Sequence, residues 1–233
     1  MTTVLDREGL RAEALRIHAR YAVEVVEGLG FCPWARAARE QGRVCTRVLL
    51  ESDTTPAAVI DQVTALERDA SCEIGLLVFP ELTLGRIPFQ HFAAAVRAGY
   101  EPRAGAAAFA IADFHPDAAP NLASAAELVA FIRRSPDPTL QLVRRSTLAA
   151  VRLGDGPGTR FVDLSAWAPS SIPPAPEPAP LHERVAGANL RQVQSLGVEH
   201  VLALFTAIER DRDASYARHG LPLPPWRASS TSS

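Results

Sequence analysis

One cysteine of this chain stands where a helix is expected to begin. Gly28 and Gly30 end one helical stretch, and Cys32 comes directly before Pro33, a residue suited to the first position of the next helix. Free backbone N–H groups and the positive end of the helix dipole favour a thiolate at such a position. We therefore predict that Cys32 is a nucleophile and that Trp34 beside it contacts the substrate. The alternative is a small buried side chain, since free cysteine is among the most buried residue types.

A histidine and an aspartate follow a predicted buried strand. The apolar segment 106–114 leads into His115-Pro116-Asp117, at the strand end where α/β proteins commonly place functional loops. His115 could act there as a general base or acid, with Asp113 or Asp117 fixing its tautomer. The alternative is structural: Asp117 caps the next turn and His115 makes a hydrogen bond within the fold.

Two arginines stand at the end of a predicted helix, just before a serine and two prolines. We expect Arg133, Arg134 and Ser135 to bind an anionic group of a substrate. A guanidinium group forms paired hydrogen bonds with a carboxylate or a phosphate. The alternative is that both arginines only balance the dipole at the end of the helix.

The residue types exclude several kinds of chemistry. All 24 basic residues are arginine, so Schiff-base catalysis, lysine-bound pyridoxal phosphate and a Walker A phosphate loop are excluded. The three cysteines form no CxxC pair, and no histidine pair or dense carboxylate cluster accompanies them, so we predict no metal site. No Gly-x-Gly-x-x-Gly follows a strand, and no cofactor is expected.

Length and charge limit the partners. The chain has 233 residues and a formal net charge of -2, which argues against nucleic-acid binding. No apolar run reaches the ~18 residues of a membrane span, and no signal-peptide pattern precedes the first helix. We therefore predict a cytoplasmic protein that acts on a small molecule, not on nucleic acid or a membrane.

The elements that must position these residues alternate along the chain. Apolar periodicity, caps and first-turn prolines predict helices over 7–27, 33–41, 56–68, 88–100, 124–134 and 139–152. Continuous or β-rich apolar runs predict strands over 44–50, 74–79 and 106–114. This pattern predicts an α/β protein (α+β as the alternative) with a small three-stranded sheet and helices packed on it. A ferredoxin-like or related sandwich is expected, with the strand order left open.

Composition divides the chain into four parts. Residues 1–153 form the α/β core, and residues 154–180 are a Gly/Pro-rich insertion or linker. Residues 181–219 are predicted to be a helical segment that docks on the core and that Gly197 could break in two. Residues 220–233 are predicted to be a disordered tail.

Three segments together resemble a bacterial family called "domain of unknown function 1415". Residues 28–35 (Gly-Leu-Gly-Phe-Cys-Pro-Trp-Ala) resemble its Gly-Leu-Gly-Leu-Cys-Pro-Phe-Ala, and residues 114–117 match its Phe-His-Pro-Asp. Residues 134–138 (Arg-Ser-Pro-Asp-Pro) resemble its Arg-Ser-Pro-Tyr-Pro. The similarity runs from about residue 10 to residue 151 and resumes over 189–197.

The family has no established activity, but the resemblance implies that Cys32, His115, Asp117 and Arg134 carry the function. The chain departs from the family pattern elsewhere. Gln141 stands where the family has histidine, Arg133 where it has asparagine, and Ala118 where it has tyrosine. A site that used that histidine would therefore be altered here.

These observations favour a small cytoplasmic enzyme. Cys32 would be its thiolate, His115 its base or acid, Asp117 the group that orients the imidazole, and Arg134 the holder of an anionic substrate group. Acyl or amide transfer and thiol redox chemistry both fit. The alternatives are a non-catalytic protein that binds a small ligand or haem, and an accessory scaffold that recruits a protein partner through residues 154–180.

Overall fold

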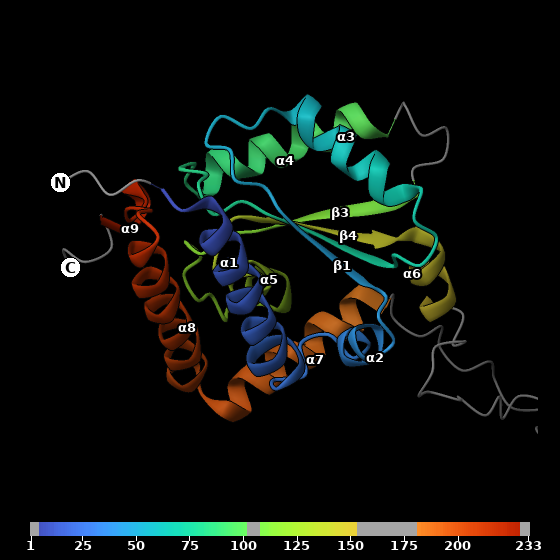
Figure 1. The fold of residues 1–233 in the computed structure, drawn as a ribbon. Coiled ribbons are helices and arrows are strands. Elements are labelled where there is room, and N and C mark those ends of the chain that lie inside the picture. The colour runs from blue at the N-terminus through green and yellow to red at the C-terminus, as the bar shows by residue number, and fades with distance from the viewer. Residues whose placement is uncertain (1–4, 102–107, 153–180, 229–233) are drawn as a thin grey trace, which may run out of the picture.

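A computed structural model describes residues 5–101, 108–152 and 181–228, in which helices cover both faces of a four-stranded sheet (Figure 1). The strands are β1 (Val44–Val48), β2 (Ile74–Val78), β3 (Phe109–Phe114) and β4 (Thr139–Arg144), in the order β1-β2-β4-β3. β1 is parallel to β2, whereas β4 is antiparallel to β2 and to β3. The carboxyl ends of β1, β2 and β3 therefore lie at one end of the sheet, where β4 begins.

The α/β class is confirmed, but the prediction of three strands is wrong. The stretch predicted as one helix over 139–152 is β4 followed at once by α6 (Arg145–Arg152). Leu140 and Leu142 are buried and the residues after each are more exposed, which is the two-residue period of a strand. No turn residue separates β4 from α6, so the sequence indicates a single element. A ferredoxin-like arrangement is not confirmed, because neighbouring β1 and β2 are parallel and helices lie on both faces.

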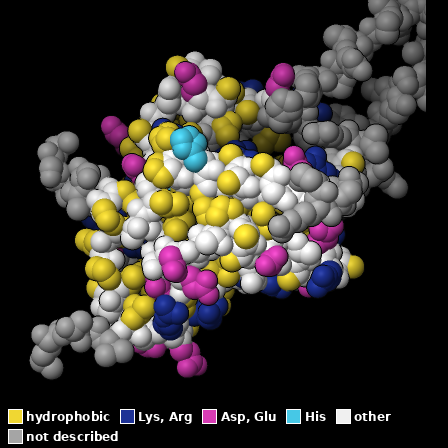
Figure 2. Space-filling model, turned by 90° about the horizontal axis from the view of Figure 1, so that it is seen from above, with side chains coloured by type: hydrophobic (Ala, Val, Ile, Leu, Met, Phe, Trp, Pro, Cys, Tyr) yellow, Lys and Arg dark blue, Asp and Glu magenta, His cyan; other side chains and the backbone are white. Residues whose placement is uncertain are grey.

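Two helices, α3 (Pro56–Glu67) and α4 (Arg86–Tyr100), cover the upper face of the sheet in Figure 1. The Thr55 hydroxyl caps α3 by accepting the Ala58 N–H at 3.3 Å, as the predicted cap and first-turn proline indicate. The core beneath these helices includes Val63, Leu66, Leu77, Phe79, Phe89, Phe92, Leu140 and Leu142. Seen from above, the outer side of this layer carries hydrophobic side chains in its middle and charged side chains toward its margins (Figure 2).

The lower face of the sheet is covered by α1 (Arg7–Tyr21), α5 (Ala125–Ile132), α7 (Leu181–Leu196) and α8 (Val198–Arg218). The single helix predicted over 7–27 changes at Ala22 into the π-helical segment Ala22–Glu27. The core of this layer includes Leu10, Ile17, Val25, Val48, Val78, Leu128, Phe131 and Phe205.

The C-terminal region follows its prediction in one place and differs in another. Gly197, with a φ of 85°, separates α7 from α8, because the left-handed region favours glycine. Within the tail predicted to be disordered, Pro225–Ala228 form the short helix α9, and Trp226 packs on the body of the protein. The insertion predicted over 154–180 lies outside the described residues.

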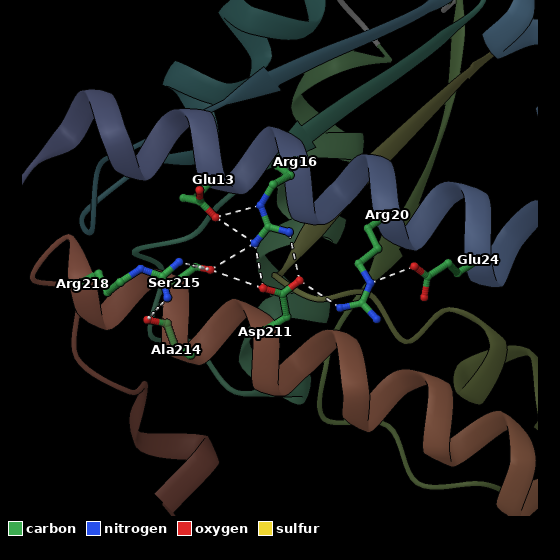
Figure 3. Close-up of polar contacts among 8 residues, drawn as sticks. All are labelled: Glu13, Arg16, Arg20, Glu24, Asp211, Ala214, Ser215 and Arg218. Atoms are coloured by element: carbon green, nitrogen blue, oxygen red, sulfur yellow. Dashed lines mark hydrogen bonds and ion pairs between the residues drawn. The ribbon is translucent and has the colours of Figure 1, made fainter.

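An ion-pair network on the surface joins α1 to α8 (Figure 3). The Asp211 carboxylate accepts hydrogen bonds from Arg16 at 2.7 and 2.9 Å and from Arg20 at 2.8 Å. Glu13 and Glu24 hold the same two arginines from within α1. These arginines, Arg16 first, keep the pKa of Asp211 far below its usual value.

In the part of the chain that the structure describes, no helix is both long enough and apolar enough to cross a membrane.

Candidate functional site

A buried carboxylate lies where β4 begins, at the carboxyl ends of the other three strands. Asp137 has no exposed surface, and its two oxygens accept hydrogen bonds from Arg212 Nε at 2.8 Å and the Tyr216 hydroxyl at 2.7 Å. Arg212, also almost fully buried, donates to the Pro80 carbonyl at 3.3 Å and lies over the Tyr216 ring at 4.4 Å. Burial, and then the Asp137 carboxylate, raise the pKa of Tyr216. These partners hold α8 against the end of the sheet.

The loop that carries Asp137, residues 135–139, is also held by α1, through His18. The Ser135 and Thr139 hydroxyls both donate to the Asp137 carbonyl, at 2.5 and 2.9 Å. Because the Thr139 hydrogen points there, its oxygen accepts from His18 Nε2 at 3.0 Å. Burial lowers the pKa of His18 to about 4, so this imidazole is neutral at physiological pH. We call Asp137, Arg212, Tyr216, Thr139, Ser135 and His18 the Asp137 cluster. Its hydrogen bonds are satisfied internally, so the substrate contact predicted for Ser135 has no support.

Arg134 is paired inside the fold as well. Its Nε donates to Glu209 of α8 at 2.8 Å, and the other oxygen of Glu209 accepts from Arg227 at 2.6 Å. Arg134 also lies over the Phe205 ring, 5.7 Å from its centroid. These contacts attach α8 and α9 to the loop after α5. Arg134 therefore has an anionic partner inside the fold, and the substrate contact expected from sequence stays a prediction.

Cys32 lies in the loop before α2 (Ala35–Glu40), which begins two residues later than predicted. The backbone N–H groups of Trp34 and Ala35 act to lower the pKa of the thiol, the effect expected at a helix start. The Ala35 N–H donates its own hydrogen bond to the Cys32 carbonyl at 3.3 Å. Burial nevertheless raises the pKa of Cys32 to about 11, because loss of water outweighs those two N–H groups and the Glu27 carboxylate opposes a second negative charge. The structure thus gives no support for a thiolate here. Trp34 is the half-buried N-cap residue of α2.

His115 is buried with both ring nitrogens occupied. Nε2 lies 3.0 Å from the Leu84 carbonyl oxygen, and Nδ1 accepts the backbone N–H of Asp117 at 3.0 Å. The backbone N–H of Asp117, not its carboxylate, contacts Nδ1, and the Asp117 side chain is exposed. The orienting role of that carboxylate stays a prediction. Burial lowers the pKa of His115. Among the described residues no hydrogen bond joins His115 to Cys32.

A pocket of about 280 Å³ lies beside His115 at the edge strand β3. It opens between the start of α4, the end of β3, and α5. The lining residues are Arg86, Gln90, Asp113, His115, Ala118, Ala126, Val129, Ala130 and Arg133. A backbone hydrogen bond of 3.1 Å from His115 N–H to the Arg133 carbonyl holds two of its walls together.

Two guanidinium groups line this pocket without an anionic partner. Within the described parts of the chain, Arg86 and Arg133 make no hydrogen bond and no close ion pair through their side chains. The carboxylate of the pocket, Asp113, pairs at 3.3 Å with Arg97 instead. Burial lowers the pKa of Arg133, and Asp113 partly offsets this effect, but a guanidinium stays charged in proteins. We call the pocket lined by Arg86, His115 and Arg133 the edge pocket.

The start of α4 adds further positive potential. Its N-cap residue is Gly85, which has no side chain to cap the first N–H groups of this 15-residue helix. Arg86 is the first residue of the helix. The edge pocket therefore combines two cationic side chains with an uncapped helix start.

A larger groove of about 570 Å³ runs along the other edge strand, β1. Its arginines are already paired: Arg11 donates to the Val48 carbonyl at 2.6 Å, and Arg47 donates to Gln62 at 2.8 Å. The smaller edge pocket is thus the stronger candidate for a ligand site.

Of the predicted site residues, only His115 and Arg133 meet in one pocket. Sequence reasoning missed Arg86 and Gln90, although Arg86 stands two residues before the helix-opening Pro88. Asp113, named beside Asp117 as a group that could fix the His115 tautomer, also lines this pocket. It also missed the Asp137 cluster, whose members come from three separate segments: α1, residues 135–139 and α8.

The structure is that of an α/β protein with a small pocket lined by two cationic side chains, and no group of metal-ligating side chains is found among the described residues. The chain belongs to the family described as "Protein of unknown function (DUF1415)", whose pattern matches residues 15–153. This confirms the resemblance inferred from the sequence. The matched span contains the whole sheet and every lining residue of the edge pocket, whereas Arg212 and Tyr216 lie beyond it. No curated protein and no solved structure matches the chain.

Proposed function

We propose that this protein binds a small organic anion in the edge pocket. One observation carries the proposal: Arg86 and Arg133 line the same pocket, and neither has an anionic partner among the residues that the structure describes. The proposal keeps the anionic substrate expected from sequence and keeps Arg133 as its contact, but replaces Arg134 with Arg86.

An anion in the edge pocket would offset the free-energy cost of burying the Arg133 guanidinium. Removing a guanidinium from water costs free energy unless an opposite charge or hydrogen-bond acceptors replace the water. Asp113 attracts the Arg133 guanidinium, but only from beyond ion-pair distance, because Asp113 pairs with Arg97. The positive charge of Arg97 repels Arg133. A carboxylate or phosphate in the pocket would accept hydrogen bonds from both free arginines and from the Gln90 amide.

The apolar wall of the edge pocket limits the size of the ligand. Ala118, Ala126, Val129 and Ala130 present short apolar side chains from α5 and the preceding loop. A volume of about 280 Å³ lies just below the usual range for pockets that bind drug-sized molecules. The ligand class is therefore a small molecule with one anionic end and a short apolar body.

Binding can be tested by NMR titration of the full-length protein with three probes: butyrate, inorganic phosphate and the neutral butyramide. We expect an anion to shift amide signals of α4, β3 and α5, with butyramide much weaker. Arg133→Gln should weaken anion binding about tenfold or more, the value of one hydrogen bond to a charged group.

The matched control is Arg68→Gln, which removes the same charge from an exposed position at the end of α3. It should bind anions like the parent protein. Equal binding by Arg133→Gln and the parent, or the same affinity for butyramide as for butyrate, would contradict the proposal.

Thiol chemistry at Cys32 is a second candidate function. The observation in its favour is that Cys32 lies just before α2, where the N–H groups of Trp34 and Ala35 lower the pKa of the thiol against the effect of burial. An enzyme that uses this thiol for acyl transfer, amide transfer or redox chemistry would need the sulfur to ionise near neutral pH. The rate of iodoacetamide alkylation against pH, followed on the peptide that contains Cys32, tests this. A rate that rises only above pH 9 excludes it.

Two further proposals come from the sequence alone. These are a cytoplasmic location and a protein partner for the proline-rich stretch within residues 154–180, which lies outside the described residues. Deleting residues 170–180 should abolish capture of such a partner while leaving anion binding intact.

A further inference from the structure

The edge pocket contains a carboxylate, Asp113, beside its two cationic side chains. Asp113 is the fifth residue of the edge strand β3, and its side chain is 21% exposed, so a ligand can reach it. Arg97 donates to one Asp113 oxygen at 3.3 Å, and the same nitrogen donates to the Ile111 carbonyl at 3.3 Å. Both contacts are long for hydrogen bonds. Within the described ranges the second Asp113 oxygen accepts no hydrogen bond, so it is an acceptor available to a ligand.

The cationic side chains reach the pocket from two other elements. Arg86 comes from the start of α4 on one face of the sheet, and Arg133 follows α5 on the other face (Figure 1). The Arg133 guanidinium lies over the Phe114 ring, 5.8 Å from its centroid, a contact that favours its place beside the end of β3. In the described part of the chain, no ion pair joins Asp113 to Arg86 or Arg133. The pocket thus presents separate groups of both signs.

We infer that the ligand of the edge pocket is a small α-amino acid in its zwitterionic form. The inference rests on the proposed function, because Arg86 and Arg133 bind the carboxylate of the amino acid as they would bind that of any small organic anion. Asp113 accepts hydrogen bonds from the ammonium group. The short apolar side chains of α5 and the preceding loop contact the side chain of the amino acid.

An amino acid suits these charges better than a simple anion does. A simple anion would place its negative charge in the same small pocket as the Asp113 carboxylate, and like charges held close together repel. In an α-amino acid the ammonium group stands on the carbon next to the carboxylate, so it offsets this repulsion. It also forms charge-assisted hydrogen bonds with Asp113, each of which typically contributes about tenfold or more to affinity.

The test compares two ligands of equal shape by NMR titration of the full-length protein. L-2-aminobutyrate has an ammonium group where (S)-2-methylbutyrate has a methyl group, and the two share their carboxylate and ethyl group. We expect L-2-aminobutyrate to bind about tenfold or more tightly, and to shift amide signals at the end of β3 and the start of α4.

The outcomes separate this inference from the proposed function. Equal affinities, or tighter binding of (S)-2-methylbutyrate, would overturn the amino-acid ligand and leave anion binding in place. Binding of neither ligand would overturn both. This comparison uses the parent protein, so it decides the inference even if a variant of the pocket does not fold.

A substitution then assigns the ammonium contact to Asp113. Asp113→Asn keeps the size of the side chain and removes its charge, and we expect it to lose most of the preference for L-2-aminobutyrate over (S)-2-methylbutyrate. The matched control is Asp61→Asn, which removes a carboxylate from an exposed position on α3 and should keep the full preference. An unchanged preference in Asp113→Asn would overturn the contact on which the inference is built.

Discussion

Arg133 and Arg134 are neighbours in the sequence but belong to two sites of opposite character. Arg134 turns toward α8 and pairs with Glu209, beside the Asp137 cluster, in which Asp137 and Arg212 satisfy each other. Arg133 turns toward the edge pocket and has no anionic partner within residues 5–101, 108–152 and 181–228. Charged groups near the end of this sheet are therefore of two kinds. Those with internal partners hold the helices in place, and those without partners are available to a ligand.

The largest loss of stability is expected when the carboxylate of the Asp137 cluster is removed. Asp137→Ala should lower the free energy of unfolding by about 3–5 kcal/mol, because it leaves the buried Arg212 guanidinium without a counter-charge. Urea denaturation measures this. Asp117→Ala removes the same group from an exposed side chain and should change stability by less than about 0.5 kcal/mol. Equal effects of the two substitutions would show that the cluster does not support the fold.

The buried His18 of the same cluster predicts a pH dependence. Burial lowers the pKa of His18 to about 4 in the folded protein, against about 6.5 in an unfolded chain. Between these values the unfolded state binds more protons, so stability is complete above pH 6.5 and falls as the pH drops toward 4. At about 1.4 kcal/mol per pKa unit, the loss approaches 3 kcal/mol. Unfolding curves at several pH values should show a shallower decline for His18→Gln, and an equal decline in both proteins would contradict this assignment.

Matched substitutions of the two neighbouring arginines should differ in their effect on stability. Arg134→Met should cost about 1.5 kcal/mol, the low end for a hydrogen bond to a charged group, because Arg227 still pairs with Glu209. Arg133→Met should change stability by no more than about 0.5 kcal/mol, since it breaks no ion pair within the described residues. Thermal unfolding without added anions compares them. A larger loss for Arg133→Met would mean that Arg133 has a structural role.

The smallest effect is expected at the surface network of Figure 3. Asp211→Asn should lower stability by about 0.5–1 kcal/mol, because exposed ion pairs contribute little even when several share one carboxylate. The difference from the parent protein should shrink in 1 M salt, which screens exposed charges. A loss as large as that of Asp137→Ala would show that exposure does not separate the two networks that hold α8.

The local part of the fold could be predicted from the sequence. Thr55 with Pro56 predicts the start of α3, the apolar run from Ile74 predicts β2, and Gly197 marks the break between α7 and α8. Each of these signals acts within a few residues. β4 was missed because its alternation is short and runs directly into α6, so its neighbours in the sheet determine its conformation.

The candidate site was predicted only in part, for the same reason. The sequence alone determined the start of α3, the position of β2, the family and the absence of lysine chemistry, because short-range sterics, capping and composition govern these properties. Only the tertiary structure decided which charged groups have partners. The partner of Arg134 is 75 residues away, and the burial that keeps the Cys32 thiol protonated comes from packing around it. Ionisation and availability to a ligand depend on water and charge in three dimensions, and a linear spacing of residues does not specify these.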